Sequence, residues 1–147
     1  MLTHKSTSGK NSKGFSLIEV LVAIVVMSLG ALGFASLLIS GLSSNKTAFD
    51  RSQASIFAYD IIDAMRSNRA KAIQGNYNRV VTAAAPTGDT VAEADVALWL
   101  KNLSTNLPSG SGAIAVEQAT GEVSVSVSWD ESKGAEASKT LTVNSRL

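Results

Sequence analysis

The sequence has no cysteine and a single histidine, His4. Without cysteine, neither a disulfide framework nor thiolate chemistry is available. His4 lies in a short polar stretch at the N-terminus, so removal of that stretch would leave a chain with neither residue type. The usual zinc sites and Ser-His or Cys-His catalysis would then be excluded. A site built from carboxylates alone stays open and needs positive evidence.

Basic residues are concentrated at the N-terminus. Residues 1–14 carry Lys5, Lys10 and Lys13 and no acid, in a chain of 13 basic and 12 acidic residues. Beyond them ten basic side chains face twelve acidic ones, a net charge of −2. Residues 1–14 are also rich in serine and glycine and lack apolar periodicity, which predicts a flexible leader. No basic patch is evident elsewhere, so we expect no nucleic-acid partner. We also expect no cofactor.

A long apolar run follows, FSLIEVLVAIVVMSLGALGFASLLISGL over residues 15–42, with Glu19 as its one charge. As a helix it would span roughly 42 Å, whereas a bilayer core needs about 20 apolar residues. A chain of this size cannot enclose such a helix in a soluble core. An ordinary signal peptide has a shorter apolar run of about 7–15 residues. The pattern predicts one membrane-spanning helix, with the lysine-bearing N-terminus in the cytoplasm and the rest exported.

The helix is expected to continue through residues 43–74 in an amphipathic form. No proline or glycine interrupts residues 48–73, and one apolar side recurs at helical spacing: Ala54, Ala58, Ile61, Ile62, Met65, Ala72 and Ile73. Gly75 is the expected C-terminal cap. We expect this stripe to pack beneath a small head. Phe49 and Ile56 lie away from the stripe and are predicted to contact another subunit.

Residues 75–147 are predicted to form that head. Residues 76–89 resemble a loop, and Thr90 with Glu93 forms a capping-box pattern for a helix over about 91–104. Val96, Trp99, Leu100, Leu103 and Leu107 are expected to face inward. Strands are predicted at about 113–118, 122–129 and 139–146, the second from the alternation of valine and serine. The fold class is therefore α+β: a long N-terminal helix packed on a small antiparallel sheet with one short extra helix.

The most informative stretch is Lys13-Gly14-Phe15-Ser16-Leu17-Ile18-Glu19-Val20. A basic leader ends in glycine, an apolar helix follows, and an acid lies at its fifth residue. This stretch resembles the class III signal of type IV prepilins. The helical AxxxAxDIIDAMRSNR segment (54–69) and the strand ending in Ser128-Trp129-Asp130 are similar to minor pilins of the PilV type.

The resemblance implies several partners and locations. A membrane prepilin peptidase would cut between Gly14 and Phe15 and methylate the Phe15 amine. The partners would be other minor pilins, the major pilin and the inner-membrane assembly platform. The chain would lie in the inner membrane as a single span, with its head in the periplasm, and then in the pilus. Many major pilins carry a disulfide that this chain lacks, which fits a minor subunit.

Glu19 has a physical role in this scheme. A charge inside a bilayer costs about 2.5–3.5 kcal/mol at the helix centre and less near the interface. Cleavage would create an ammonium group at Phe15, one helical turn from Glu19, and a neighbour's amine would lie within reach of staggered helices. Pairing offsets the cost of burying either charge. We therefore predict that processing permits assembly through Glu19.

The sequence leaves alternatives to a minor pilin. Arg66 and Asn68 end a helix, and the resemblance implies a packing or partner role for them. A minor pseudopilin of a type II secretion system shares the same N-terminal motif, and a pilus-tip adhesin is a further alternative. An enzyme is the least favoured class, because turn and capping roles account for candidate carboxylates in loops or at a helix start, such as Asp89, Glu93, Asp95, Asp130 and Glu131.

Overall fold

The computed structural model describes residues 14–132, 134 and 137–147, so the predicted leader lies outside the described residues except for Gly14. Two compact units are present, one ending at Leu42 and the other running Ser43–Leu147. Helix α1 (Leu17–Ser67) contributes residues to both. The helix was expected to begin at Phe15 but begins two residues later. The Ser16 carbonyl is the first acceptor, bonding the Glu19 and Val20 amides at 3.0 and 3.2 Å, so Phe15 stays outside the helix.

The first unit presents its apolar side chains to the surroundings. An 18-residue stretch of α1 has a mean hydropathy of 2.5 and none of it is buried within the protein. Among the described residues, α1 is the one helix whose length and composition suit a membrane crossing. The Ser28 hydroxyl donates to the Ile24 carbonyl four residues back, which satisfies the hydroxyl inside the helix.

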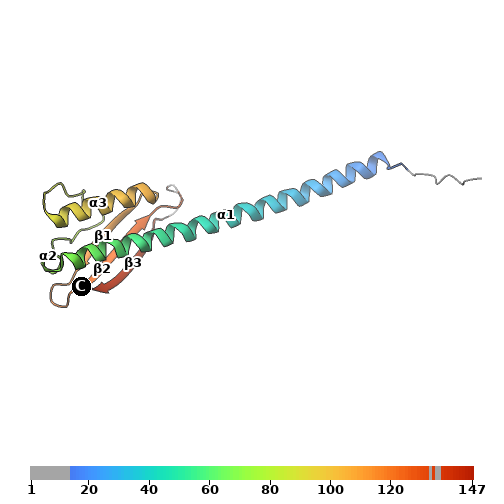
Figure 1. The fold of residues 1–147 in the computed structure, drawn as a ribbon. Helices are drawn as coiled ribbons and strands as arrows, with labels where there is room; N and C mark the ends of the chain where they lie inside the picture. Colours follow the sequence, from blue (N-terminus) through green and yellow to red (C-terminus); the bar gives the residue numbers. More distant parts are fainter. Residues whose placement is uncertain (1–13, 133, 135–136) are drawn as a thin grey trace, which may run out of the picture. The chain divides into compact units, whose positions relative to one another are not determined.

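The second unit is a three-stranded antiparallel sheet with helices on one face. The strands β1 (Ser111–Val116), β2 (Glu122–Trp129) and β3 (Lys139–Arg146) lie in the order β1-β2-β3. The second half of α1 and helix α3 (Val91–Asn106) lie against this sheet (Figure 1). The Trp99 indole N–H donates to the Phe57 carbonyl at 2.9 Å, which joins α3 to α1. The α+β fold expected from the sequence is confirmed.

One hydrophobic core joins these elements. Alternate residues of β2 are buried, namely Val123, Val125, Val127 and Trp129, and the serines between them face outward. They share a cluster with the α1 stripe, Ala54, Ala58, Ile61, Ile62 and Met65. Burying this much apolar surface contributes about 25 cal/mol for each Å², and the sheet and the helix each supply part of it. The predicted apolar stripe is confirmed, with Ile73 only half-buried.

The end of the long helix differs from the prediction. A helix continuous to Gln74 was expected, but α1 ends at Ser67 and α2 (Arg69–Ile73) follows as a separate turn. Asn68 breaks it, with φ −118° and ψ 43°. Its side-chain amide donates to the Tyr77 hydroxyl at 3.2 Å, a tertiary contact that helical periodicity does not report. Gly75 follows with φ +84°, as expected of a glycine that ends a helix.

Smaller boundary differences follow from pairing and capping. The capping box at Thr90 and Glu93 is present, but α3 continues to Asn106, two residues past the expected end. β1 occupies 111–116 instead of 113–118, because its pairing with β2 runs from Ser111↔Ser128 to Val116↔Val123. The segment expected to be a loop over 76–89 contains one bridge, Arg79 to Ile114. β2 and β3 have the expected boundaries.

Candidate functional site

The proposed processing point is an accessible peptide bond. Gly14, Phe15 and Ser16 lie outside any helix or strand, and the Phe15 side chain is 83% exposed. A Cβ built at Gly14 would meet no atom within 4 Å. The fold of this chain therefore does not itself require glycine at this position. Any requirement for a small residue would come from an enzyme that binds the segment.

Glu19 lies in the first turn of α1 and is exposed. The first amides of a helix lack intrahelical partners and carry a partial positive charge, which favours an acid in this turn. Glu19 is the third residue of the helix, and Phe15 precedes the helix by two residues. The carboxylate and the amine that cleavage would create therefore belong to the same helix end.

Small residues give the apolar part of α1 places where another backbone can approach. A Cβ built at Gly30, Gly33 or Gly41 meets nothing within 4 Å. Glycine in a helix interior costs about 1 kcal/mol relative to alanine. Among the described residues, no packing contact offsets this cost at these three positions. Close packing against a neighbouring helix is what small residues permit in membranes.

The four predicted partner-contact residues fall into two groups. Phe49 and Ile56 are 59% and 51% exposed on α1, with no role in the core. Arg66 donates to Asp63 at 2.8 Å and to the Ser145 hydroxyl at 2.9 Å, tying the end of α1 to β3. Asn68 bonds Tyr77. Thus Arg66 and Asn68 have internal packing roles, while Phe49 and Ile56 offer uncovered apolar surface.

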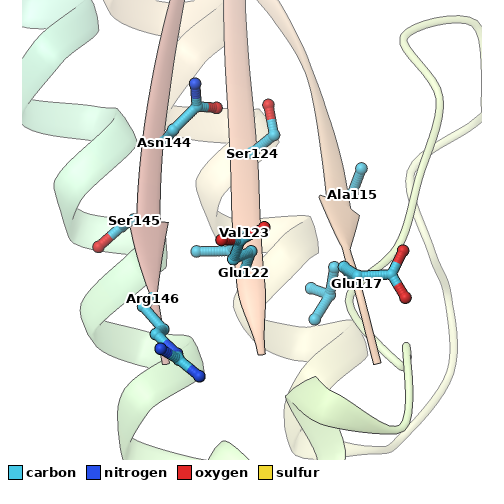
Figure 2. A pocket seen from close by; sticks show the side chains of 9 residues that line it. Ala115, Glu117, Glu122, Val123, Ser124, Asn144, Ser145 and Arg146 are labelled. Atoms are coloured by element: carbon cyan, nitrogen blue, oxygen red, sulfur yellow. The ribbon is translucent and has the colours of Figure 1, made fainter. Parts of the chain in front are cut away.

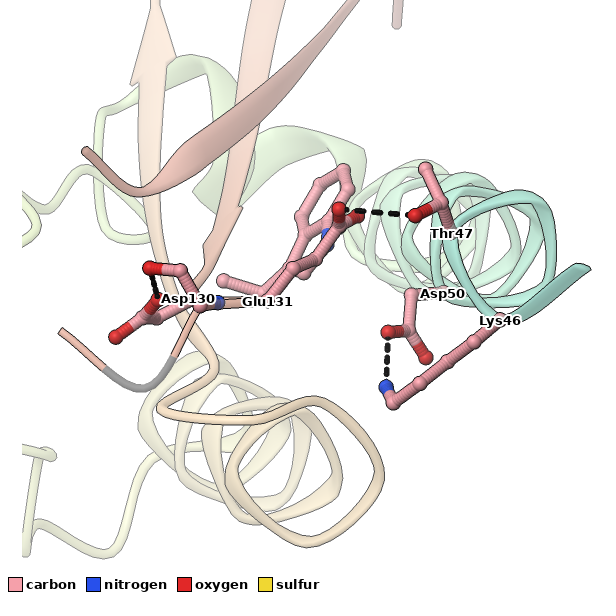
Figure 3. Close-up of polar contacts among 7 residues, drawn as sticks. Lys46, Thr47, Asp50, Asp130 and Glu131 are labelled. Atoms are coloured by element: carbon pink, nitrogen blue, oxygen red, sulfur yellow. Dashed lines mark hydrogen bonds and ion pairs between the residues drawn. The ribbon is translucent and has the colours of Figure 1, made fainter. Parts of the chain in front are cut away.

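The Glu131 carboxylate joins the end of β2 to α1, a contact that the sequence did not predict. Glu131 accepts from the Trp129 indole at 2.9 Å and from the Thr47 hydroxyl at 3.1 Å (Figure 3). Lys46 pairs with Asp50 at 2.5 Å, and the Asp50 side chain is only 4% exposed. Glu131 was expected to serve a turn, but it links β2 to α1. Asp130 does act in a turn, accepting from the amide and hydroxyl of Ser132.

A second buried polar contact lies at the other end of the core. The Tyr77 side chain, 1% exposed, donates to Asp95 at 2.6 Å and accepts from Asn68. Burial, followed by the bond to Asp95, raises the pKa of Tyr77 to about 12. Asp95 was expected to serve a cap or turn, which is wrong: it lies within α3 and bonds across the core. The one sequence signal was an isolated tyrosine within a polar segment.

Among the described residues of the head, two open hollows can be placed on the outer face of the sheet. One, of about 710 Å³, runs from Ala115 across Ser124 to Asn144 and ends at Glu117, Glu122 and Arg146 (Figure 2). The second, of about 770 Å³, lies between the 78–83 segment and β1. Both have floors of small side chains. Among the described residues no group of three or more His, Cys, Asp or Glu side chains is arranged to hold a metal ion.

Comparison with known protein families assigns the N-terminal region. Residues 9–35 match the family model of the prokaryotic N-terminal methylation motif. Neither a curated protein nor a solved structure matches the chain. The match covers the lysine-glycine-phenylalanine boundary, Glu19 and the first three quarters of the apolar run. The fold adds an unburied apolar helix and a small α+β head. The methylation motif and this fold together support a type IV pilin-like precursor with a membrane-capable N-terminal helix.

Proposed function

We propose that the chain is a minor pilin of the PilV type, processed by a prepilin peptidase and incorporated into a type IV pilus. The observation that carries the proposal is the arrangement at residues 14–19. An exposed, non-helical Gly14–Phe15 bond directly precedes a helix whose first turn holds Glu19 and whose next turns are wholly apolar and unburied. This arrangement serves cleavage followed by lateral assembly.

Cleavage would change the helix end in two ways. It would remove Lys5, Lys10 and Lys13, which hold the N-terminus at the cytoplasmic surface. It would also leave an ammonium group at Phe15. In an apolar bundle a lone Glu19 carboxylate is costly, and an amine on the same helix or its neighbour offsets that cost. Processing would thus supply the missing partner for Glu19 and couple maturation to assembly.

The head suits a structural subunit. Its core is continuous with the amphipathic part of α1, so a force or contact on the head reaches the helix through packed side chains. The exposed Phe49 and Ile56 lie on α1 outside that core and provide apolar surface for a neighbouring subunit. Other minor pilins, the major pilin and the inner-membrane assembly platform are the partners of this proposal.

Mass spectrometry of the membrane-extracted protein tests the proposal. In cells with a functional prepilin peptidase, we expect a mature chain that begins at N-methylated Phe15. In cells without the peptidase, we expect the full-length chain. A chain cut elsewhere, or uncut in both strains, would contradict the proposal and remove the basis for the role of Glu19.

A minor pseudopilin of a type II secretion system is the second candidate. The matched motif, residues 9–35, covers only the signal and the first three quarters of the apolar run, which both classes need. Deletion of the gene separates them. Loss of surface pili and twitching would support the pilus, whereas retention of exported enzymes in the cell would support secretion.

A further inference from the structure

The two edge strands of the sheet differ in how the outward backbone groups are hydrogen-bonded. At the β1 edge, Arg79 and Ile114 exchange two backbone hydrogen bonds of 2.9 and 3.0 Å. The side-chain oxygen of Asn78 accepts from the Val116 amide at 2.8 Å. The segment at 78–79 therefore closes this edge. Natural sheets commonly cover an edge in this way, because unpaired strand backbone recruits other strands.

The β3 edge is open. The Leu147 amide donates to the Gly121 carbonyl, so these two residues form a hydrogen-bonded pair. Such pairs alternate along an antiparallel ladder, and in the β2–β3 register the odd-numbered residues of β3 therefore direct their amides and carbonyls toward β2. The even-numbered residues Thr140, Thr142 and Asn144 then direct their amides and carbonyls outward. Within the part of the chain that the structure describes, these backbone groups have no partner. Only at the strand's end does Arg66 reach an outward carbonyl, that of Arg146, at 3.4 Å.

Different kinds of side chain flank the open edge on the two faces of the sheet. Thr142 and Thr140 bond the hydroxyls of Ser126 and Ser128 on the outer face, each at 2.9 Å. Leu141 and Val143, half-buried, face the core. Tyr59 lies seven residues before Arg66, on nearly the same side of α1, and is 51% exposed. A further strand here would place alternate side chains against apolar groups on one face and hydroxyls on the other.

We propose that the open edge of β3 binds an extended segment of another protein, which adds a fourth strand to the sheet. Alternating outward amides and carbonyls at Thr140, Thr142 and Asn144 match only an extended backbone. The strand that fits has apolar residues on the Tyr59 side, threonine or serine on the other, and acids at its ends. A second copy fits less well, because β3 has a basic residue at each end and no acid, so self-pairing would offer neither end of the strand an opposite charge. This inference goes beyond the proposed function and does not depend on N-terminal cleavage.

The test uses the full chain in detergent micelles and a synthetic peptide, Glu-Val-Thr-Val-Thr-Val-Glu. Hydrogen exchange at individual amides is followed by NMR. At a peptide concentration of about ten times its Kd, exchange at Thr140, Thr142 and Asn144 is expected to slow about tenfold. The same peptide with N-methyl groups on alternate amides is the control, since it keeps the side chains but loses one hydrogen-bonding edge. Equal slowing by both peptides, or no slowing by either, would overturn the proposal.

Two matched variants add a test on the protein side. Thr142→Pro removes the central outward amide, and proline is tolerated at an outward-facing position of an edge strand. Thr142→Val keeps that amide, and both variants lose the hydroxyl bond to Ser126. Peptide-induced slowing at Asn144 is expected with Thr142→Val and not with Thr142→Pro. Without peptide, an exchange rate at these amides that falls as the protein concentration rises would mean that a second copy occupies the edge. That result would refute the choice of partner.

Discussion

The Tyr77 hydroxyl donates a 2.6 Å hydrogen bond to the Asp95 carboxylate, joining the segment after α2 to the N-terminal part of α3. Asn68, the residue that interrupts the long helix, completes the group by donating to the same hydroxyl at 3.2 Å. The three residues come from elements far apart in the sequence. Their contact explains both the break at Asn68 and the position of α3, so it should contribute measurably to the stability of the head.

Tyr77→Phe is expected to destabilise the head by about 1–3 kcal/mol, because it leaves the partly buried Asp95 and Asn68 side chains without their shared partner. Urea unfolding of the detergent-solubilised chain, followed by tryptophan fluorescence, measures the loss. Tyr59→Phe is the matched control, since Tyr59 is half exposed and its hydroxyl bridges no such group. Equal stabilities for the two variants would rule out a structural role for this contact.

Stability should also fall at alkaline pH because of Tyr77. Its pKa is raised to about 12 in the folded chain from 10.0, so the folded state holds the proton more tightly than the unfolded state between these values. Its contribution is therefore constant below pH 10 and declines as pH rises toward 12, by about 1.4 kcal/mol per pH unit. The wild type should show this extra decline relative to Tyr77→Phe. Parallel profiles for the two proteins above pH 10 would contradict the assignment.

Gly112→Ala is expected to destabilise the head by about 1–3 kcal/mol through overpacking. A Cβ at Gly112 would lie 2.3 Å from the Trp99 ring, whose other edge is held by the bond to Phe57. The ring cannot retreat without breaking that bond. Ala115→Ser, on the outer face of the same strand, should change stability by less than about 0.5 kcal/mol. Thermal unfolding of both variants provides the comparison, and an unshifted Tm for Gly112→Ala would show that the ring can move.

Gly14→Leu is expected to remain full length, because a bulky side chain would obstruct a protease that binds the extended segment. The chain itself leaves room for a Cβ at this position, so the variant should fold normally. Gly30→Leu is the control, since it adds similar bulk where a Cβ also meets nothing within 4 Å and should be cut normally. Intact mass distinguishes the products. Recovery of a chain starting at Phe15 from Gly14→Leu would disprove the requirement.

Glu19→Ala should be cut at Gly14 but incorporated about tenfold less, if the lost pairing is worth about 1.4 kcal/mol. The ratio of this chain in sheared filaments to that in membranes measures incorporation. Glu19→Asp, which keeps the charge in the first helical turn, should retain more incorporation than the alanine variant. Incorporation of Glu19→Ala at the wild-type level would refute the proposed coupling of maturation to assembly through Glu19.

Much of the fold was predictable because it depends on local patterns. The apolar run, the 3.6-residue stripe on α1 and the valine–serine alternation of β2 each report burial directly. The capping box at Thr90 and Glu93 was predictable for the same reason, since its partners lie three residues apart. The strand order followed from none of these patterns, although pairing of sequential strands is the simplest arrangement.

The sequence by itself determined the membrane-capable helix, the methylation motif and the position of Glu19, because each is written in consecutive residues. Only the tertiary structure decided the break at Asn68, the roles of Asp95 and Glu131, the link from Arg66 to Ser145, and the contrast between a closed β1 edge and an open β3 edge. These features join residues up to 84 positions apart. Their hydrogen bonds form only after the core has brought the elements together, so no local period or spacing encodes them.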